Sequence, residues 1–154
     1  MVFRTFLPGD EVAFRELNEA WITTLFGMEE KDREILSDPV GHILNEGGHI
    51  VMAVDGDCAV GCCALVTMEP GCFELSKMAV HEGRRGTGIG RKLLEYAVQH
   101  ARDVGAKRLY LETNTKLPNA IHLYEAVGFR HLPPERVRKS PFARSNVQME
   151  MWLG

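Results

Sequence analysis

The sequence has no long apolar run, and none approaches the roughly 18 apolar residues that mark a membrane-spanning helix. Its first residues lack both an extended apolar region and a small-residue cleavage site, so we expect no signal peptide. The four cysteines include no Cys-x-x-Cys pair and have no histidine at metal-ligand spacing, which disfavours a zinc or redox centre. We therefore expect reduced thiols, a cytoplasmic location and no metal.

Charge of one sign is not in large excess either. The formal net charge of −3 gives no general attraction to nucleic acid or to an anionic membrane, so we expect neither as a partner. The sequence also has no internal repeat and no low-complexity tract. A length of 154 residues, with 45% hydrophobic and 25% charged residues, is typical of one globular domain, here residues 1–154.

Hydrophobic periodicity predicts an alternation of strands and helices. The expected strands are 2–6, 49–54, 58–68, 73–80, 108–112, 129–132 and 145–152, and the expected helices are 11–26, 29–36, 88–104 and 118–127. Short turns make the second, third and fourth strands an antiparallel meander. The long helix between the fourth and fifth strands is a crossover that makes those two strands parallel. We therefore predict a mixed sheet in an α/β protein of α+β type, with the last two strands paired as a hairpin.

The turn between strand 73–80 and helix 88–104 is rich in glycine and arginine. The first N–H groups of a helix have no internal partners, and the helix dipole adds partial positive charge there. Glycines let an anion approach the backbone closely. Basic side chains surround the same point, at Arg84, Arg85, Arg91 and Lys92. Such a helix start suits a phosphate or a pyrophosphate.

Two common phosphate-binding motifs do not fit this turn. Gly83 and Gly88 have the spacing of a Walker motif, but Ile-Gly follows Gly88 where the motif needs Lys-Ser or Lys-Thr. A dinucleotide fingerprint that starts at Gly86 would need its third glycine at position 91, which is Arg91. A nucleotide-dependent oxidoreductase is therefore disfavoured.

The pattern that does fit is Arg-x-x-Gly-x-Gly, at Arg85, Gly88 and Gly90. It resembles the loop with which the GNAT superfamily of N-acyltransferases holds the pyrophosphate of acyl-coenzyme A. Residues 119–129, Asn-Ala-Ile-His-Leu-Tyr-Glu-Ala-Val-Gly-Phe, resemble the second signature of that family, with its Asn and Ala adjacent. The order of elements also matches, strongly over 73–129 and weakly before. The resemblance implies the GNAT fold, a mostly antiparallel sheet with one splayed parallel pair, flanked by helices.

The resemblance implies acetyl-coenzyme A as the cofactor. In the family, a bulge at the end of the central strand splays the two parallel strands and aims a backbone amide at the thioester oxygen, as in an oxyanion hole. Asn119 would hydrogen-bond the pantetheine arm or cap its helix, and Asn114 is a weaker candidate. The implied cofactor-binding residues are Met78, Ala79, Val80, Arg85, Gly86, Thr87, Gly88, Ile89, Gly90, Arg91, Asn114, Asn119 and Tyr124.

Two catalytic residues are expected. Tyr124 matches the family tyrosine near the coenzyme sulfur, where a phenol can protonate the leaving thiolate; alternatively it packs on the sheet. Glu74 is our first choice as general base, because it lies four residues before Met78 on the central strand, which would put both side chains on one face. Alternatively Glu74 faces solvent, and Glu112 is the second choice as base.

The implied function is N-acetyl transfer from acetyl-coenzyme A directly to a primary amine of an unidentified small-molecule or peptide acceptor. The alternative is a non-catalytic acyl-coenzyme A-binding or regulatory module on the same fold. The second expected helix and its flanks carry acidic residues that form a solvated face or attract a cationic amine, namely Glu29, Glu30, Asp32, Glu34 and Asp38. A monomer and a homodimer are both compatible with the sequence.

Overall fold

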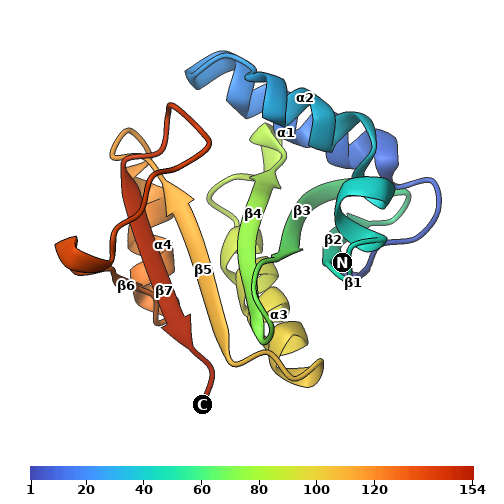
Figure 1. Cartoon of the computed structure of the whole chain (residues 1–154). Coiled ribbons are helices and arrows are strands. Elements are labelled where there is room, and N and C mark those ends of the chain that lie inside the picture. The colour runs from blue at the N-terminus through green and yellow to red at the C-terminus, as the bar shows by residue number, and fades with distance from the viewer.

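The computed structural model describes all 154 residues as a seven-stranded sheet with helices on both faces (Figure 1). The strands are β1 (Val2–Thr5), β2 (His49–Asp55), β3 (Cys58–Thr67), β4 (Cys72–Val80), β5 (Arg108–Thr113), β6 (Arg130–His131) and β7 (Val147–Trp152). The α-helices are α1 (Glu11–Leu25), α2 (Glu30–Ser37), α3 (Ile89–Asp103) and α4 (Pro118–Val127). Short helical turns occupy Val40–Leu44, Glu82–Arg84 and Pro134–Arg136.

Every expected strand and helix is present, and the observed ends of these elements differ from the expected ones by at most two residues. The strand order is β1-β2-β3-β4-β5-β7-β6, so β7 lies between β5 and β6. β6 and β7 pair antiparallel, which confirms the expected hairpin. The π-helical turn at Val40–Leu44 was not predicted from the sequence.

Two apolar layers hold the helices on the sheet. α3 and α4 lie behind the sheet in Figure 1. The larger core joins α3 to the sheet through the fully buried side chains of Leu93 and Leu94, and the partly buried Leu123 and Val127 of α4 pack against that core. α1 and α2 cover the other face, where Phe14, Ile22 and Leu36 are buried against β2, β3 and β4. α3 buries one apolar stripe along its length, as amphipathic helices do.

The parallel pair β4–β5 is splayed. Its ladder runs only from Cys72 opposite Arg108 to Leu75 opposite Leu111, and the two strands diverge beyond that point. All other pairs in the sheet are antiparallel. The prediction of a mixed sheet with one splayed parallel pair is confirmed. Past Leu75, the β5-facing edge of β4 has no strand partner.

β4 contains a bulge on its β3 side. Ser76 pairs with Ala64 and Ala79 with Cys62, so three steps along β4 oppose two steps along β3. The extra residue lies at Lys77, the only non-glycine residue with positive φ, at 52°. A bulge of this kind bends the strand and increases its twist.

The bulge reverses the side-chain alternation along β4. Before it, Leu75 packs in the core beneath α3, and after it Met78 packs against the same core. Ala79 packs instead against α1 and α2. Glu74, the neighbour of Leu75, therefore lies on the face opposite to Met78. The expectation that Glu74 and Met78 share a face is wrong, because it assumed an unbroken strand period.

The helices are all too short or too polar for a transmembrane span.

Candidate active site

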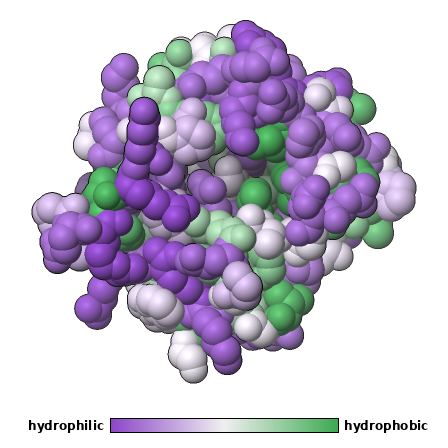
Figure 2. Space-filling view, in the orientation of Figure 1, coloured by the Kyte–Doolittle hydropathy of each residue, from purple (hydrophilic) through white to green (hydrophobic).

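A cavity with a volume of about 630 Å³ opens between β4 and β5, where the two strands separate. Figure 2 shows a hollow on this face of the molecule, with apolar surface inside it and hydrophilic surface around it. Divergence of the two strands creates this space, because neither strand supplies a neighbour for the other beyond their short ladder. Such a concave, partly apolar site suits a small ligand or cofactor.

The glycine-rich turn forms one end of the cavity. Gly88 is the N-cap of α3 with φ of 84°, and Gly86 has φ of 79°. No heavy atom lies within 4 Å of the position that a Cβ would take at either glycine, so the backbone there is open to a ligand. Arg84 and Arg85 line the same end, with Arg84 paired to Asp55 at 2.6 Å.

Most of the implied cofactor-binding residues line this cavity. From β4 these are Met78, Ala79 and Val80, and from the turn and the first turn of α3 they are Arg85, Gly86 and Gly90. The backbone of β4 beyond Leu75 faces the cavity without a strand partner on that side. Unpaired backbone N–H and C=O groups of this kind need partners, which an extended ligand can supply.

The other four residues of the expected loop do not line the cavity. The side chain of Ile89 is buried in the core beneath α3, and Arg91 is an exposed residue 3.6 Å from Glu95. Thr87 donates its hydroxyl hydrogen bond to the carbonyl of Arg84, within the loop itself. Together with Gly88, these residues shape the helix start rather than present side chains to the cavity.

Tyr124 of α4 lines the cavity with a hydroxyl that makes no hydrogen bond within the protein. Its ring lies edge-on to Phe129, with 5.9 Å between the ring centroids, so it also packs on the sheet. Burial raises the pKa of the Tyr124 phenol well above its usual value, and the neighbouring Cys63 adds to the effect. The phenol is therefore protonated at neutral pH.

Glu74 lines the cavity from β4 and accepts no hydrogen bond from another protein group. Burial raises the pKa of its carboxyl group to about 7, and the neighbouring Glu112 contributes to the rise. Glu74 is half-buried rather than facing open solvent. A carboxyl group that titrates near neutral pH can both accept and release a proton under physiological conditions.

Glu112 also lines the cavity, but its oxygens are already engaged. The hydroxyl of Tyr110 donates to one oxygen at 2.7 Å, and Ser140 donates to the other. Both hydrogen bonds fix the position of the carboxyl group and occupy its two oxygens. The geometry therefore favours Glu74 over Glu112 as a proton acceptor.

The two asparagines differ in their surroundings. Asn114 donates to the carbonyl of Arg144 and accepts from the backbone of Lys116 at 2.8 Å, so its side chain stabilises two loops. Asn119 lines the cavity and its side chain makes no hydrogen bond. The N-cap of α4 is Leu117, so the interpretation of Asn119 as a helix cap is wrong.

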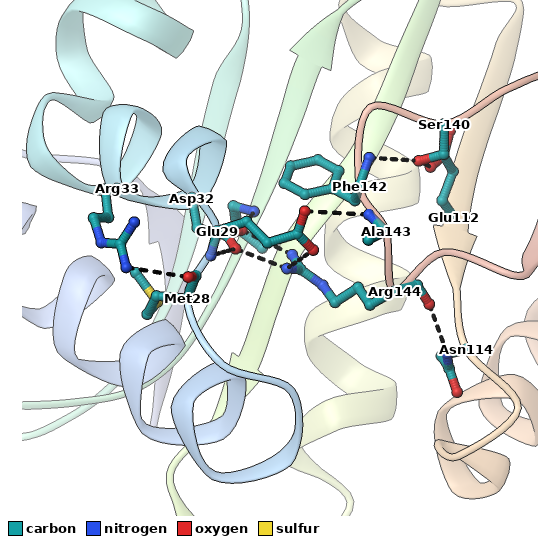
Figure 3. Close-up of polar contacts among 11 residues, drawn as sticks. Met28, Glu29, Asp32, Arg33, Glu112, Asn114, Ser140, Phe142, Ala143 and Arg144 are labelled. Carbon is teal, nitrogen blue, oxygen red and sulfur yellow. Dashed lines mark hydrogen bonds and ion pairs between the residues drawn. The ribbon is translucent and has the colours of Figure 1, made fainter.

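Of the five acidic residues at α2, Glu30, Glu34 and Asp38 are exposed, as expected for a solvated face, but the other two are not. Asp32 is fully buried and binds Lys77 and Arg144, while Glu29 pairs with Arg144 at 3.4 Å (Figure 3). Asp32 is neutralised inside the protein and the partly exposed Glu29 is paired with Arg144, so neither carboxylate is free to attract a cationic substrate. This cluster was not predicted from the sequence. Lys77, a charged residue near the apolar end of strand 73–80, was a signal that could have indicated a buried ion pair.

Aromatic side chains form part of the remaining cavity wall. Trp21 and Phe26 come from the end of α1, and Phe142 comes from the connection between β6 and β7. The guanidinium of Arg144 lies 5.9 Å from the Trp21 ring centroid, and the ammonium of Lys116 lies 5.7 Å from that of Phe26. We refer to the part of the cavity that is lined by Trp21, Phe26 and Phe142 as the acceptor end.

Comparison with known proteins gives the family. Residues 12–129 match the Acetyltransferase (GNAT) family. The chain belongs to the GNAT family. This confirms the family indicated by the Arg-x-x-Gly-x-Gly loop and by the segment around Tyr124, and it agrees with the fold described above.

Individual relatives are similar over different lengths. A streptothricin acetyltransferase of Streptomyces lavendulae is 31% identical over 82% of this chain and 80% of its own length. An uncharacterized N-acetyltransferase of Escherichia coli K12, YjgM, is 36% identical over 62% of this chain and 59% of its own length, so that match spans less than two thirds of the relative. An acetyltransferase of the GNAT family from Staphylococcus aureus Mu50 has the same fold, with a TM-score of 0.87, 22% identity and 99% of each chain covered.

Proposed function

We propose that this protein is an N-acetyltransferase that moves an acetyl group from acetyl-coenzyme A directly to a primary amine. One observation carries the proposal. A single cavity is lined by a basic, glycine-rich helix start, a protonated phenol and a carboxyl group that titrates near neutral pH. Membership of the acetyltransferase family supports the same reaction class.

The cofactor would lie along the splayed edge of β4. Its pyrophosphate suits the turn at Arg85 and Gly86, where backbone N–H groups and the dipole of α3 favour an anion. Its pantetheine arm can pair with the free backbone edge at residues 78–80, which no strand occupies. When bound, the cofactor supplies the activated acetyl group as a thioester.

Two side chains, Glu74 and Tyr124, would transfer protons during the reaction. Glu74 accepts the proton of the incoming amine, directly or through water, as the new nitrogen–carbon bond forms. Tyr124 would supply a proton to the leaving thiolate of the cofactor. A backbone N–H of the β4 bulge would stabilise negative charge on the carbonyl oxygen. Glu74 is suited to its task because its pKa lies near the working pH.

The acceptor is proposed only as a primary amine on a small molecule or peptide. An amine at the acceptor end would lie among aromatic side chains, because Trp21, Phe26 and Phe142 form part of the cavity wall there. The relative from Streptomyces lavendulae carries the name streptothricin acetyltransferase, which makes amine antibiotics of that kind a reasonable first test. Polyamines, amino acids and peptide N-termini complete the acceptor panel.

Thiol release from acetyl-coenzyme A tests the proposal directly. The wild-type protein should release thiol only when a suitable amine is present. Tyr124→Phe should lower kcat by about 100-fold or more, because the thiolate then leaves without a proton donor. Tyr96→Phe is the matched control, since Tyr96 stacks on Phe3 at 6.2 Å and does not line the cavity.

The result that contradicts the proposal is equally specific. Binding of acetyl-coenzyme A without thiol release in the presence of any amine would favour the non-catalytic binding module. Equal rates for Tyr124→Phe and wild type would remove Tyr124 from the mechanism.

A further inference from the structure

We propose that Asp32 is a positioning residue, which fixes both the bulge of β4 and the loop that covers the acceptor end. This inference rests on the proposed function, because the bulge and the loop line the two halves of the proposed active site. Asp32 itself does not line the cavity. It would act through Lys77 and Arg144, which do.

The carboxylate of Asp32 binds three segments of the chain at once. Lys77 on β4 donates to Oδ1 at 2.6 Å. Arg144, in the connection between β6 and β7, donates to Oδ2 at 2.7 Å and to Oδ1 at 2.8 Å. The backbone N–H of Glu29, just before α2, donates to Oδ2 at 3.0 Å. Figure 3 shows Arg144 pointing at Asp32 and Glu29 from the opposite side of the site.

Lys77 connects Asp32 to the bulge of β4. It is the extra residue of the bulge, and its φ of 52° lies in the left-handed region, which is unfavourable for a residue with a Cβ. Glycine is the residue that usually occupies such a position. The Lys77 side chain is 2% exposed and ends on Asp32. The ion pair therefore compensates for an unfavourable backbone conformation and holds the bulge in place.

The bulge determines the direction of the backbone that follows it. Met78, Ala79 and Val80 line the cavity directly after Lys77, on the edge of β4 that lacks a strand partner. These are the backbone groups that would contact the pantetheine arm and the thioester oxygen. A shift at Lys77 would turn them away, so Asp32 affects the acyl-donor half of the site through this one contact.

Arg144 connects Asp32 to the loop that precedes β7. Its guanidinium pairs with Asp32 and Glu29, and Glu29 also accepts from the backbone N–H of Ala143 at 3.1 Å. Two cations lie near the Phe142 ring, with the Lys77 ammonium 4.6 Å and the Arg144 guanidinium 4.5 Å from its centroid. The loop at residues 142–144 is thus attached to α2 and to the β4 bulge together.

The attached loop carries a polar group that has no partner in the protein. The hydroxyl of Ser145 is buried and makes no hydrogen bond, and Ser145 lines the cavity beside Arg144 and Phe142. Buried hydroxyl groups normally have a partner, so this one is available to a polar group of the acceptor. Its position depends on the Arg144–Asp32 contact next to it.

Stability alone gives a weaker reason for such a cluster. Apolar side chains of similar size often replace buried ion clusters with no loss of stability, whereas removal of one partner leaves an uncompensated charge and is costly. The location of this cluster between the bulge and the acceptor loop agrees better with a positioning role. The two roles can be separated by experiment.

The test compares four variants with the wild-type protein. Asp32→Asn removes the shared charge, and Asp32→Glu restores it on a longer side chain. A triple variant, Asp32→Leu with Lys77→Met and Arg144→Met, removes the three buried charges together and leaves only the partly exposed Glu29 without its partner. Asp10→Asn is the matched control, because Asp10 pairs with Arg4 at 2.7 Å and neither residue lines the cavity.

Three readouts separate positioning from folding. Steady-state kinetics give kcat and KM for the cofactor and the amine, and melting temperature reports overall stability. Hydrogen–deuterium exchange of residues 75–80 and 141–146 reports the bulge and the loop without any need for activity. For Asp32→Asn we expect at least a tenfold lower kcat, a higher KM for the amine, and faster exchange in both segments. Asp32→Glu should recover part of the kcat, and Asp10→Asn should match the wild type.

The triple variant decides between the two roles. The proposal expects it to melt near the wild-type temperature and to remain at least tenfold slower. A triple variant as active as wild type, or an Asp32→Asn protein with unchanged kcat, would overturn the proposal. If the wild type acetylates no amine, the proposed function fails, but exchange still decides this inference. Unchanged exchange at 75–80 and 141–146 in Asp32→Asn would then contradict it.

Discussion

Among single residues, Glu74 gives the clearest dependence on pH. Its carboxyl group must lose a proton before it can accept one from the amine, and burial together with Glu112 raises its pKa to about 7. We therefore expect kcat/KM to increase with pH and to level off above about pH 7, where Glu74 is ionised. Glu74→Gln should remove this limb of the profile and lower the rate by about 100-fold or more.

Glu112 provides the matched test of that assignment. Its negative charge disfavours ionisation of Glu74, so Glu112→Gln should lower the pKa of Glu74 and move the rising limb to lower pH. Glu95→Gln is the control, because Glu95 is exposed on α3 and does not line the cavity. A limb that stays in place in Glu112→Gln, or survives in Glu74→Gln, would show that another group is the base.

At the scale of elements, α3 connects the fold to the site. Its apolar stripe is buried against the sheet, and its first residue follows the glycine-rich turn. Leu93 is fully buried, so Leu93→Ala should lower the free energy of unfolding by about 2–5 kcal/mol. Urea denaturation measures the change, and Glu95→Ala, on the exposed side of α3, should cost less than about 1 kcal/mol. Similar costs for the two variants would contradict this packing.

The elements themselves were largely predictable from the sequence. The stripe of α3 and the alternation of β7 are local patterns, and local patterns determine where a helix or strand forms. The bulge at Lys77 was expected from the family resemblance only, because its conformation depends on Asp32, a residue far away in the sequence. For the same reason the sequence could not show that Glu74 and Met78 lie on opposite faces of the sheet.

The candidate site was predictable where it follows a motif. The glycine-rich turn, Tyr124 and Glu74 were all named from the sequence, and all three contribute to one cavity. The contacts of Asn114 and Asp32 were not predictable, because both bind Arg144 in a connection that has no regular pattern. Tertiary contacts between distant loops leave little trace in spacing or periodicity.

At the scale of the whole molecule, a histidine pair makes stability depend on pH. Nδ1 of His49 lies 3.2 Å from Nε2 of His100, and the His49 ring also packs edge-on against Phe73. Burial and the nearby His100 lower the pKa of His49. At His49 the folded state therefore binds fewer protons than the unfolded state, and the contribution of this residue to stability falls as pH decreases through the ordinary histidine range near 6.5.

Thermal unfolding tests this sign. Glu74 acts in the opposite direction, because its raised pKa makes the folded state bind more protons in the same pH range, so the test uses a Glu74→Gln background. In that background the melting temperature should fall by about 2–4 °C between roughly pH 7.5 and pH 5.5. His100→Asn should reduce that fall, because it removes the charge that opposes protonation of His49. An unchanged pH dependence when His100→Asn is added to Glu74→Gln, or a Glu74→Gln protein that becomes more stable on acidification, would contradict this explanation.

The proposed function depends on acetyl-coenzyme A binding with its pyrophosphate at the start of α3, and calorimetric titration measures that binding. Three proteins are compared: wild type, Gly88→Glu and Gly105→Glu. The two glycines lie at opposite ends of α3, have φ of 84° and 89°, and both have open space around the position of a Cβ. Both substitutions therefore carry a similar backbone cost, but only Gly88→Glu places an anion at the proposed site. We predict micromolar binding by wild type and Gly105→Glu, and loss of binding in Gly88→Glu. Absence of binding by wild type, or equal binding by Gly88→Glu, would contradict the account.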